Sequence, residues 1–170
     1  LWFGTNTDIT EQREAEQRVR ESEGRLRRVI DSVLAFVGIL SPDGTLIEAN
    51  RAPLIAAGLS RDDVIGEKFW DCQWWSDSDE TRQQLRKDFE RAVSGEVIRH
   101  DVEMRVSEDE RLTIDLMMQP VFEEDRLLFV IPSGVDITDR KRFEQELAAS
   151  WEFLRSSLDG LPSQTAVVDE

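Results

Sequence analysis

The chain has 170 residues, and because 36 of them are Asp or Glu against 21 Lys or Arg, its formal net charge is −15. An excess of acid disfavours binding to the phosphates of nucleic acid and is typical of a well-solvated surface or of adaptation to high salt. The single cysteine excludes an internal disulfide and is typical of a reducing compartment. No apolar run reaches the roughly 18 residues that a membrane helix needs, so we expect a cytoplasmic fragment without direct membrane contact.

The first predicted element is a helix over residues 10–33, with Thr10 as its N-cap. Apolar and small side chains recur in it at alternating steps of four and three residues, which forms a heptad seam. The seam predicts a short parallel coiled coil, with a helix packed on its own domain as the alternative. Its members are Ala15, Val19, Ser22, Leu26, Val29 and Val33.

A β-hairpin is predicted next. Residues 33–40 form an apolar run of strand length, and Ser41-Pro42-Asp43-Gly44 has the residues of a tight turn. Residues 45–49 then form the second strand. The pattern of the first strand leaves open whether Phe36 or Val37 faces the core.

Helices are predicted in the middle of the chain. Residues 50–59 and 60–66 are expected to form two short helices, and residues 80–94 a longer one that ends before Gly95. Between them, residues 68–75 have the highest density of aromatic side chains in the chain. These side chains are Phe69, Trp70, Trp74 and Trp75.

Three strands complete the predicted domain, over residues 96–106, 111–122 and 127–135. Strands at both ends of the domain with helices between them predict an α+β fold, a five-stranded antiparallel sheet with the helices on one face. Residues that alternate along a strand share a face of the sheet. We expect the inward-facing side chains to be Ile98, His100, Val102, Met104, Ile114, Leu116, Met118, Phe129 and Ile131.

A repeated segment divides the chain. Asp8-Ile9-Thr10 reappears as Asp136-Ile137-Thr138, and the residues that follow each copy also match. A repeat of this length is a whole domain, so the chain is interpreted as part of a tandem array. The helix predicted after the second copy has its own seam, formed by Phe143, Leu147, Ser150, Leu154, Ser157 and Leu161.

Three motifs now indicate a family. They are residues 41–50 around the hairpin turn, Val64-Ile65-Gly66-Glu67, and residues 134–141 at the end of the last strand. In this order and spacing the chain resembles a PAS domain, a sensor module found in tandem in signalling proteins. The resemblance implies a sheet curved around a small cavity, with changes there transmitted to the helix after the last strand. By the same analogy, Asp136 and Thr138 form the joint between sheet and helix, with a plain structural cap as the alternative.

The repeat and the resemblance together predict the organisation of the chain. We expect residues 1–10 to be the tail of a preceding PAS-like module and residues 11–32 to be a linker helix. Residues 33–138 would form the PAS-like domain and residues 139–158 the C-terminal linker helix. Residues 159–170 would begin a following module.

The candidate cavity residues come from the aromatic segment, the longer helix and the inward faces of the strands. A filled core, rather than a ligand pocket, is the alternative interpretation of such an apolar set. The candidates are Phe69, Trp74, Leu85, Phe89, Ile98, His100, Val102, Met104, Leu116, Met118, Phe129 and Ile131.

The cofactor of such a cavity is unknown from the sequence, and none is the first expectation. His100 could ligate haem, but haem-binding relatives place their histidine on or near the longer helix, which has none here. Light-sensing relatives carry a reactive cysteine where this chain has Phe69, and Cys72 lies about one turn later. Non-covalent flavin, stacked on Trp70 or Trp74, stays open as an alternative.

The sequence has no catalytic motif and no metal-binding cluster. We therefore expect a non-enzymatic sensory and signal-transmission module of a multidomain protein, such as a sensor histidine kinase. Its expected partners are a second copy bound through the linker helices, the neighbouring domains of its own chain, and a small-molecule ligand. The alternatives are a flavin- or haem-binding redox or gas sensor and a ligand-free docking spacer.

Overall fold

The computed structural model describes residues 13, 16–17, 24 and 28–159. Its centre is a five-stranded antiparallel sheet in the order β2-β1-β5-β4-β3, which confirms the predicted fold class. The strands are β1 (Phe36–Leu40), β2 (Leu46–Ala49), β3 (Ile98–Arg105), β4 (Arg111–Glu123) and β5 (Arg126–Asp136). The first and last strands of the chain's domain, β1 and β5, are direct neighbours.

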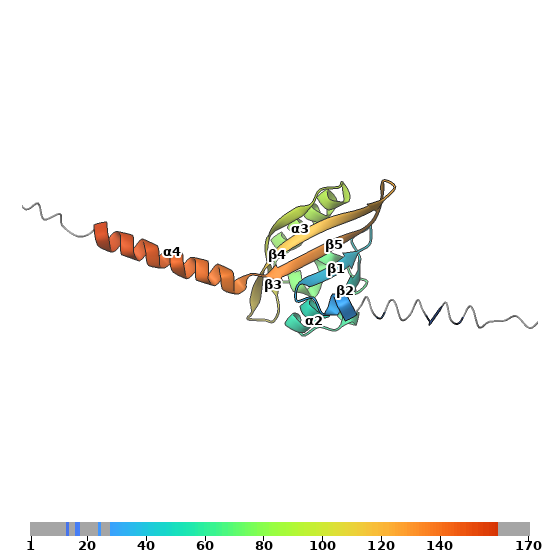
Figure 1. Ribbon diagram of the computed structural model, residues 1–170, viewed down its shortest axis with the longest axis horizontal. Helices are drawn as coiled ribbons and strands as arrows, with labels where there is room; N and C mark the ends of the chain where they lie inside the picture. The colour runs from blue at the N-terminus through green and yellow to red at the C-terminus, as the bar shows by residue number, and fades with distance from the viewer. Residues whose placement is uncertain (1–12, 14–15, 18–23, 25–27, 160–170) are drawn as a thin grey trace, which may run out of the picture.

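The helices follow the predicted order. They are α2 (Arg51–Ala57), the 3₁₀ turns η1 (Arg61–Asp63), η2 (Phe69–Asp71) and η3 (Gln73–Trp75), α3 (Asp79–Val93) and α4 (Thr138–Asp159). Figure 1 shows α3 behind the sheet, while the opposite face of β4 and β5 is open to the viewer. The helices that connect β2 to β3 therefore pack on one side of the sheet, as the α+β interpretation requires.

The core lies between the sheet and these helices. Apolar side chains from every strand meet the inner face of α3 and the 3₁₀ turns, which removes them from water and supplies the main driving force for folding. The most deeply buried apolar side chains are Leu40, Leu46, Val64, Leu85, Ile114, Met118 and Val130.

The hairpin turn between β1 and β2 depends on a glycine. Gly44 has a φ of +85°, which L-residues rarely adopt, and a Cβ there would lie 2.5 Å from the ring of Trp70. The ammonium of Lys68 closes the turn by donating hydrogen bonds to the carbonyl and carboxylate oxygens of Asp43, each at 2.7 Å. The hairpin is thereby fixed to the segment that begins η2.

Strand β1 begins three residues later than the apolar pattern predicts. Residues 33–35 are not in the sheet, because the carbonyl oxygens of Val33 and Ala35 accept hydrogen bonds from the side-chain amide of Asn50. In the described part of the preceding segment, residues 28–31 are helical. Most of the first predicted seam lies outside the described residues, as do the proposed tail 1–10 and residues 160–170 of the following module.

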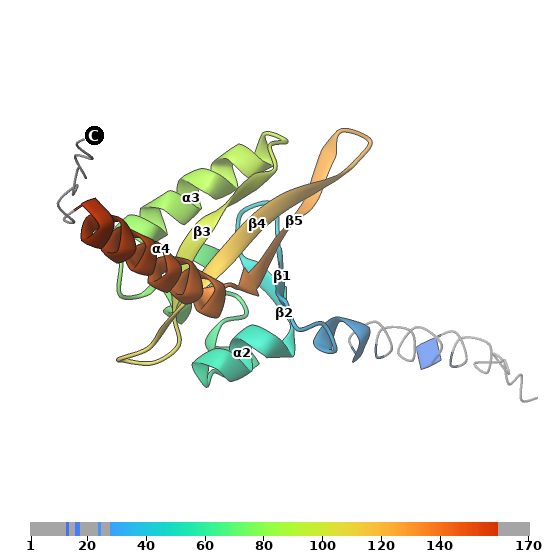
Figure 2. The same cartoon turned by 60° about the vertical axis from the view of Figure 1, so that its left-hand side comes forward.

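The C-terminal helix α4 leaves the end of β5 and projects away from the domain (Figures 1 and 2). Its apolar side chains are exposed over the described length, with exposed fractions of 66% for Phe143 and 60% for Leu147. Trp151 and Leu154 are exposed as well. None of the described helices combines the length and apolar character that a membrane crossing requires.

Candidate functional site

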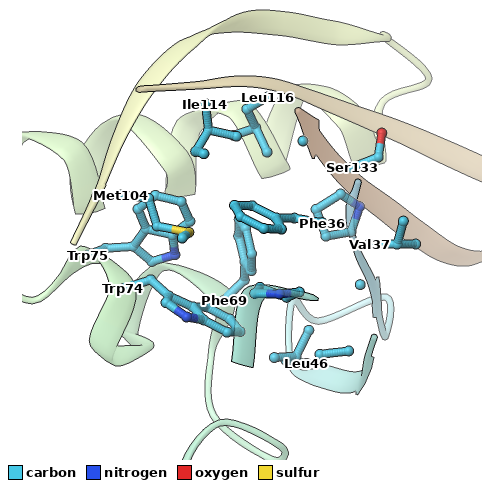
Figure 3. Close-up of a pocket in the computed structure, with 15 residues that line it drawn as sticks. Phe36, Val37, Leu46, Phe69, Trp74, Trp75, Met104, Ile114, Leu116 and Ser133 are labelled. Carbon is cyan, nitrogen blue, oxygen red and sulfur yellow. The ribbon is translucent and has the colours of Figure 1, made fainter. Parts of the chain in front are cut away.

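A small apolar cavity of about 40 Å³ lies between the inner face of the sheet and the 3₁₀ turns. Figure 3 shows Trp74, Trp75 and Met104 on one side of it, with the ring of Phe36 reaching into it from the opposite side. The strands supply Ile114 and Leu116. The full lining consists of Phe36, Val37, Gly38, Leu46, Ala49, Pro53, Phe69, Trp74, Trp75, Met104, Ile114, Leu116, Pro132, Ser133 and Gly134.

Two glycines keep the strands close around this cavity. A Cβ on Gly134 would lie 2.4 Å from the Cγ2 atom of Ile114, which is a severe clash. A Cβ on Gly38 would lie 3.1 Å from Leu46 and 3.2 Å from Pro132. Because Gly38 and Gly134 belong to the neighbouring strands β1 and β5, any larger residue there would push the cavity walls apart.

The structure brings four of the predicted cavity residues together and leaves eight elsewhere. Phe69, Trp74, Met104 and Leu116 line the cavity. Phe89, Ile98 and Met118 are buried in the core without lining it. Leu85, His100 and Val102 lie instead on a polar groove between α3 and β3.

Phe129 and Ile131 were expected to face inward, and this expectation is wrong. Val130 is fully buried and pairs with Leu40, so the residues on either side of it point to the opposite face of the sheet. Residues 127–132 read as one continuous apolar run, so alternation could not indicate the inward set. The sequence left open whether Phe36 or Val37 of β1 faces the core. Figure 3 shows that the ring of Phe36 enters the cavity and that Val37 points away.

The two indoles beside Met104 are almost completely buried, with 3% of Trp74 and of Trp75 exposed. Neither indole nitrogen has a hydrogen-bond partner among the described residues. Trp75 instead packs edge-on against Phe69, with ring centroids 5.5 Å apart. Trp75 was not among the predicted cavity residues, although it belongs to the same aromatic segment as Trp74.

His100 lies outside the cavity and is bonded to a buried carboxylate. Its Nε2 atom is 2.7 Å from Oδ2 of Asp88, which is fully buried on α3. The other oxygen of Asp88 accepts a hydrogen bond of 3.0 Å from the side chain of Gln84. This is a satisfied polar contact between helix and sheet, and it gives no support to His100 as a haem ligand.

Flavin and haem do not fit the cavity as it stands. A volume of about 40 Å³ holds about three water-sized atoms, whereas pockets for drug-sized ligands measure roughly 300–1,000 Å³. Cys72 is also buried outside the lining, and burial raises the pKa of its thiol to about 12. The thiol therefore stays protonated at neutral pH and is a poor nucleophile. Within the described residues, no group of three His, Cys, Asp or Glu side chains could hold a metal ion.

The joint between the sheet and α4 is built from two side chains and a backbone N–H of β4. The carboxylate of Asp136 accepts hydrogen bonds from the backbone N–H and the hydroxyl of Thr138, at 2.9 and 2.6 Å. The hydroxyl of Thr138 in turn accepts a bond of 2.9 Å from the backbone N–H of Thr113 on β4. Thr138 was expected to cap the helix with this hydroxyl. It is instead the first residue of α4, and its hydroxyl bonds to the sheet.

A second joint holds the segment that enters the domain. The side chain of Asn50 is 1% exposed and accepts a bond of 2.9 Å from the N–H of Val37. Its amide group donates to the carbonyl oxygens of Ile30, Val33 and Ala35, at 3.3, 3.3 and 2.8 Å. Sequence analysis assigned Asn50 to the start of a helix and to the end of the hairpin motif 41–50, but did not assign it these hydrogen bonds.

An antiparallel sheet that closes over a small apolar cavity, and whose last strand continues into a projecting helix, defines a class of sensory module. The chain belongs to the PAS family: the family model described as PAS fold matches residues 30–142. In structure it is similar to the PAS domain of BvgS from Bordetella pertussis, with a TM-score of 0.57 and 17% identity over 78% of this chain and 98% of that one.

Sequence relatives are histidine kinases. The chain is 30% identical over 155 residues to hybrid signal transduction histidine kinase D of Dictyostelium discoideum, covering 89% of this chain and 10% of the relative. It is 33% identical over 125 residues to sensor histidine kinase TmoS of Ectopseudomonas mendocina, covering 72% of this chain and 13% of the relative. The chain thus spans only about a tenth of the length of these relatives, and its sequence is homologous to part of sensor kinases.

Proposed function

We propose that the chain is a sensory and relay module of a cytoplasmic sensor histidine kinase, in which changes at the cavity are transmitted to α4. The kinase activity would belong to other segments of the protein. The similarity to two histidine kinases supports this parentage. The repeated Asp-Ile-Thr segment supports a place in a tandem array, with a neighbouring module on each side.

The observation that carries the proposal is that the cavity wall and the joint share the same strands. Ile114 lines the cavity, and the next residue back, Thr113, bonds to Thr138. Gly134 also lines the cavity, two residues before Asp136. Ile114 and Asp136 are paired across β4 and β5. A guest that displaces either strand would therefore move the start of α4 directly.

The exposed seam on α4 supports homodimerisation through the linker helices. Phe143, Leu147 and Leu154 follow the heptad spacing, and each is at least half exposed. A pair of parallel α4 helices would bury these side chains against each other. A change in the angle at which α4 leaves the sheet would then alter the packing of the pair and reach the next domain.

A second candidate function is a docking spacer that senses no ligand, because the cavity is small. The test of the relay is the full-length kinase carrying Asp136→Ala, with autophosphorylation measured with and without the stimulus. We expect the variant to keep its circular dichroism and melting temperature but to lose the response. Asp139→Ala is the matched control, because Asp139 lies in the same turn and pairs only within the helix. An Asp136→Ala kinase with a normal response would contradict the relay.

A further inference from the structure

The end of the cavity near Met104 combines an apolar wall with two indole N–H groups that have no acceptor among the described residues. Trp74 and Trp75 are both 3% exposed, both line the cavity, and both lack a partner for the indole N–H among the described residues. A buried N–H without an acceptor is costly, so such groups in native proteins usually have a partner. Here an acceptor inside the cavity would remove that cost.

The rest of the lining limits what the acceptor can be. The lining residues include no Lys, Arg or His, and a carboxylate or phosphate buried there would have no cation to balance it. Ser133 is the one lining residue with a side-chain hydroxyl, but its side chain points to the opposite face of the sheet, and Figure 3 shows its oxygen directed away from the indoles. The guest must therefore be neutral, with an apolar body facing the strands.

We infer that the cavity takes a very small neutral carbonyl compound, such as acetone, whose oxygen accepts a hydrogen bond from Trp74, Trp75 or both. This inference rests on the proposed sensory function and names the ligand class of its cavity. Met104 lies beside the indoles and is flexible enough to let the wall adapt to the guest (Figure 3). A water bound to the indoles is the competing occupant.

The test compares two probes that differ only in the acceptor. Acetone and isobutene have nearly the same shape and only four heavy atoms each, which suits a cavity of about 40 Å³, but only the ketone accepts a hydrogen bond. Each is titrated into the 170-residue chain labelled with ¹⁵N-tryptophan, and the indole N–H signals are followed by NMR. Trp70, which is outside the lining, and Trp151, which is exposed on α4, provide internal controls.

We expect the ketone to shift the Trp74 or Trp75 signal downfield and to bind about three- to tenfold more tightly than the alkene. Trp74→Phe and Trp75→Phe, singly or together, should reduce this preference, and Trp70→Phe should keep it. If a phenylalanine variant does not fold, through-bond assignment of the unchanged chain still gives the readout.

Three results would overturn the inference. Equal binding of the two probes would mean a purely apolar cavity and would leave the proposed sensory function intact. Indole N–H signals that show contact with a long-lived bound water and do not shift with the ketone would mean that this water is the acceptor. Binding of neither probe would also argue against small-molecule sensing here, and the Asp136→Ala test would then decide whether relay remains.

Discussion

The ammonium Nζ of Lys141 lies 2.6 Å from the carboxylate Oδ2 of Asp101, which joins the first turn of α4 to strand β3. This contact raises the pKa of Lys141, whose charge is stabilised by the Asp101 carboxylate. Together with the bond between Thr138 and Thr113, it holds α4 to two neighbouring strands. Two points of attachment fix the direction of a helix, whereas one would leave it free to pivot.

We therefore predict that Lys141→Met loosens the start of α4 without unfolding the domain. The backbone N–H of residue 141 bonds to the carbonyl of Ile137, and its hydrogen exchange should become faster. High salt should have a similar effect on the unchanged chain, because the pair is partly exposed and is screened by ions. Arg142→Gln is the control, since Arg142 forms its ion pair with Asp139 within the helix. Exchange that is unaffected by Lys141→Met would rule out the second attachment.

Asn50→Ala should lower the free energy of unfolding by about 1–3 kcal/mol, because it leaves several partly buried backbone groups without partners. Urea denaturation measures this effect. Asn50→Asp is the informative comparison: it keeps the acceptor for Val37 but turns a carboxylate toward the carbonyls of Val33 and Ala35.

The Asn50→Asp variant should therefore be sensitive to pH. The surrounding carbonyl oxygens and burial favour the neutral acid, so the folded state would raise the pKa of the new carboxyl group above its unfolded value of about 4. Its stability should then fall as pH rises above that value. A flat profile, or a loss below 1 kcal/mol for Asn50→Ala, would show that Asn50 does not hold the entering segment.

Cys72 should be unreactive until the domain opens. Burial, assisted by the nearby charges of Glu67 and Asp71, raises the pKa of its thiol from 9.0 to about 12. Thiol-specific reagents at pH 8 should modify it slowly in the native chain and rapidly in urea. Fast modification of the native chain would contradict the buried position.

The same pKa shift predicts a loss of stability at alkaline pH. The folded state binds the thiol proton more tightly than the unfolded state, so the contribution is complete below pH 9.0 and is lost as pH rises toward 12. Cys72→Ala lacks this titration. Between pH 8 and 11 the free energy of unfolding should therefore fall less in Cys72→Ala than in the unchanged chain, and equal slopes would count against the shift.

Leu147→Glu should weaken dimerisation, because it puts a charge in the middle of the proposed α4 seam. Sedimentation equilibrium of the 170-residue chain should show a dissociation constant raised at least tenfold, which corresponds to about 1.4 kcal/mol. Gln145→Glu adds the same charge outside the seam and serves as the control. A chain that is monomeric at high concentration before any substitution would exclude this dimer.

The inward-facing side chains of a strand could be predicted where the residue pattern allows only one assignment of its two faces. Strand β3 alternates charged and apolar residues, and the inward positions of Ile98, Val102 and Met104 follow from it. Strand β5 lacks such alternation, and both of its faces could be apolar, so Phe129 and Ile131 were assigned to the wrong face. Packing against Leu40 decides the matter, and this is a contact distant in sequence.

The contents of the cavity were harder to predict than the fold. Sequence patterns assign side chains to a face, but cavity walls depend on which neighbours leave space. The wall contains Gly38 and Gly134, whose missing side chains gave no apolar signal. The hydrogen bond from Thr113 to Thr138 was equally invisible, because it joins a strand interior to a helix start far along the chain.

The pairing of Phe36 with Gly134 has a consequence for signals that originate upstream. The chain enters and leaves the domain at the same end of two adjacent strands, within a few residues of this pair. A displacement of the incoming segment can therefore reach the outgoing helix through the backbone hydrogen bonds between β1 and β5, and no bound ligand is needed for it. In an array of such units, each module would pass on a displacement that comes from the module before it and would also respond to its own ligand.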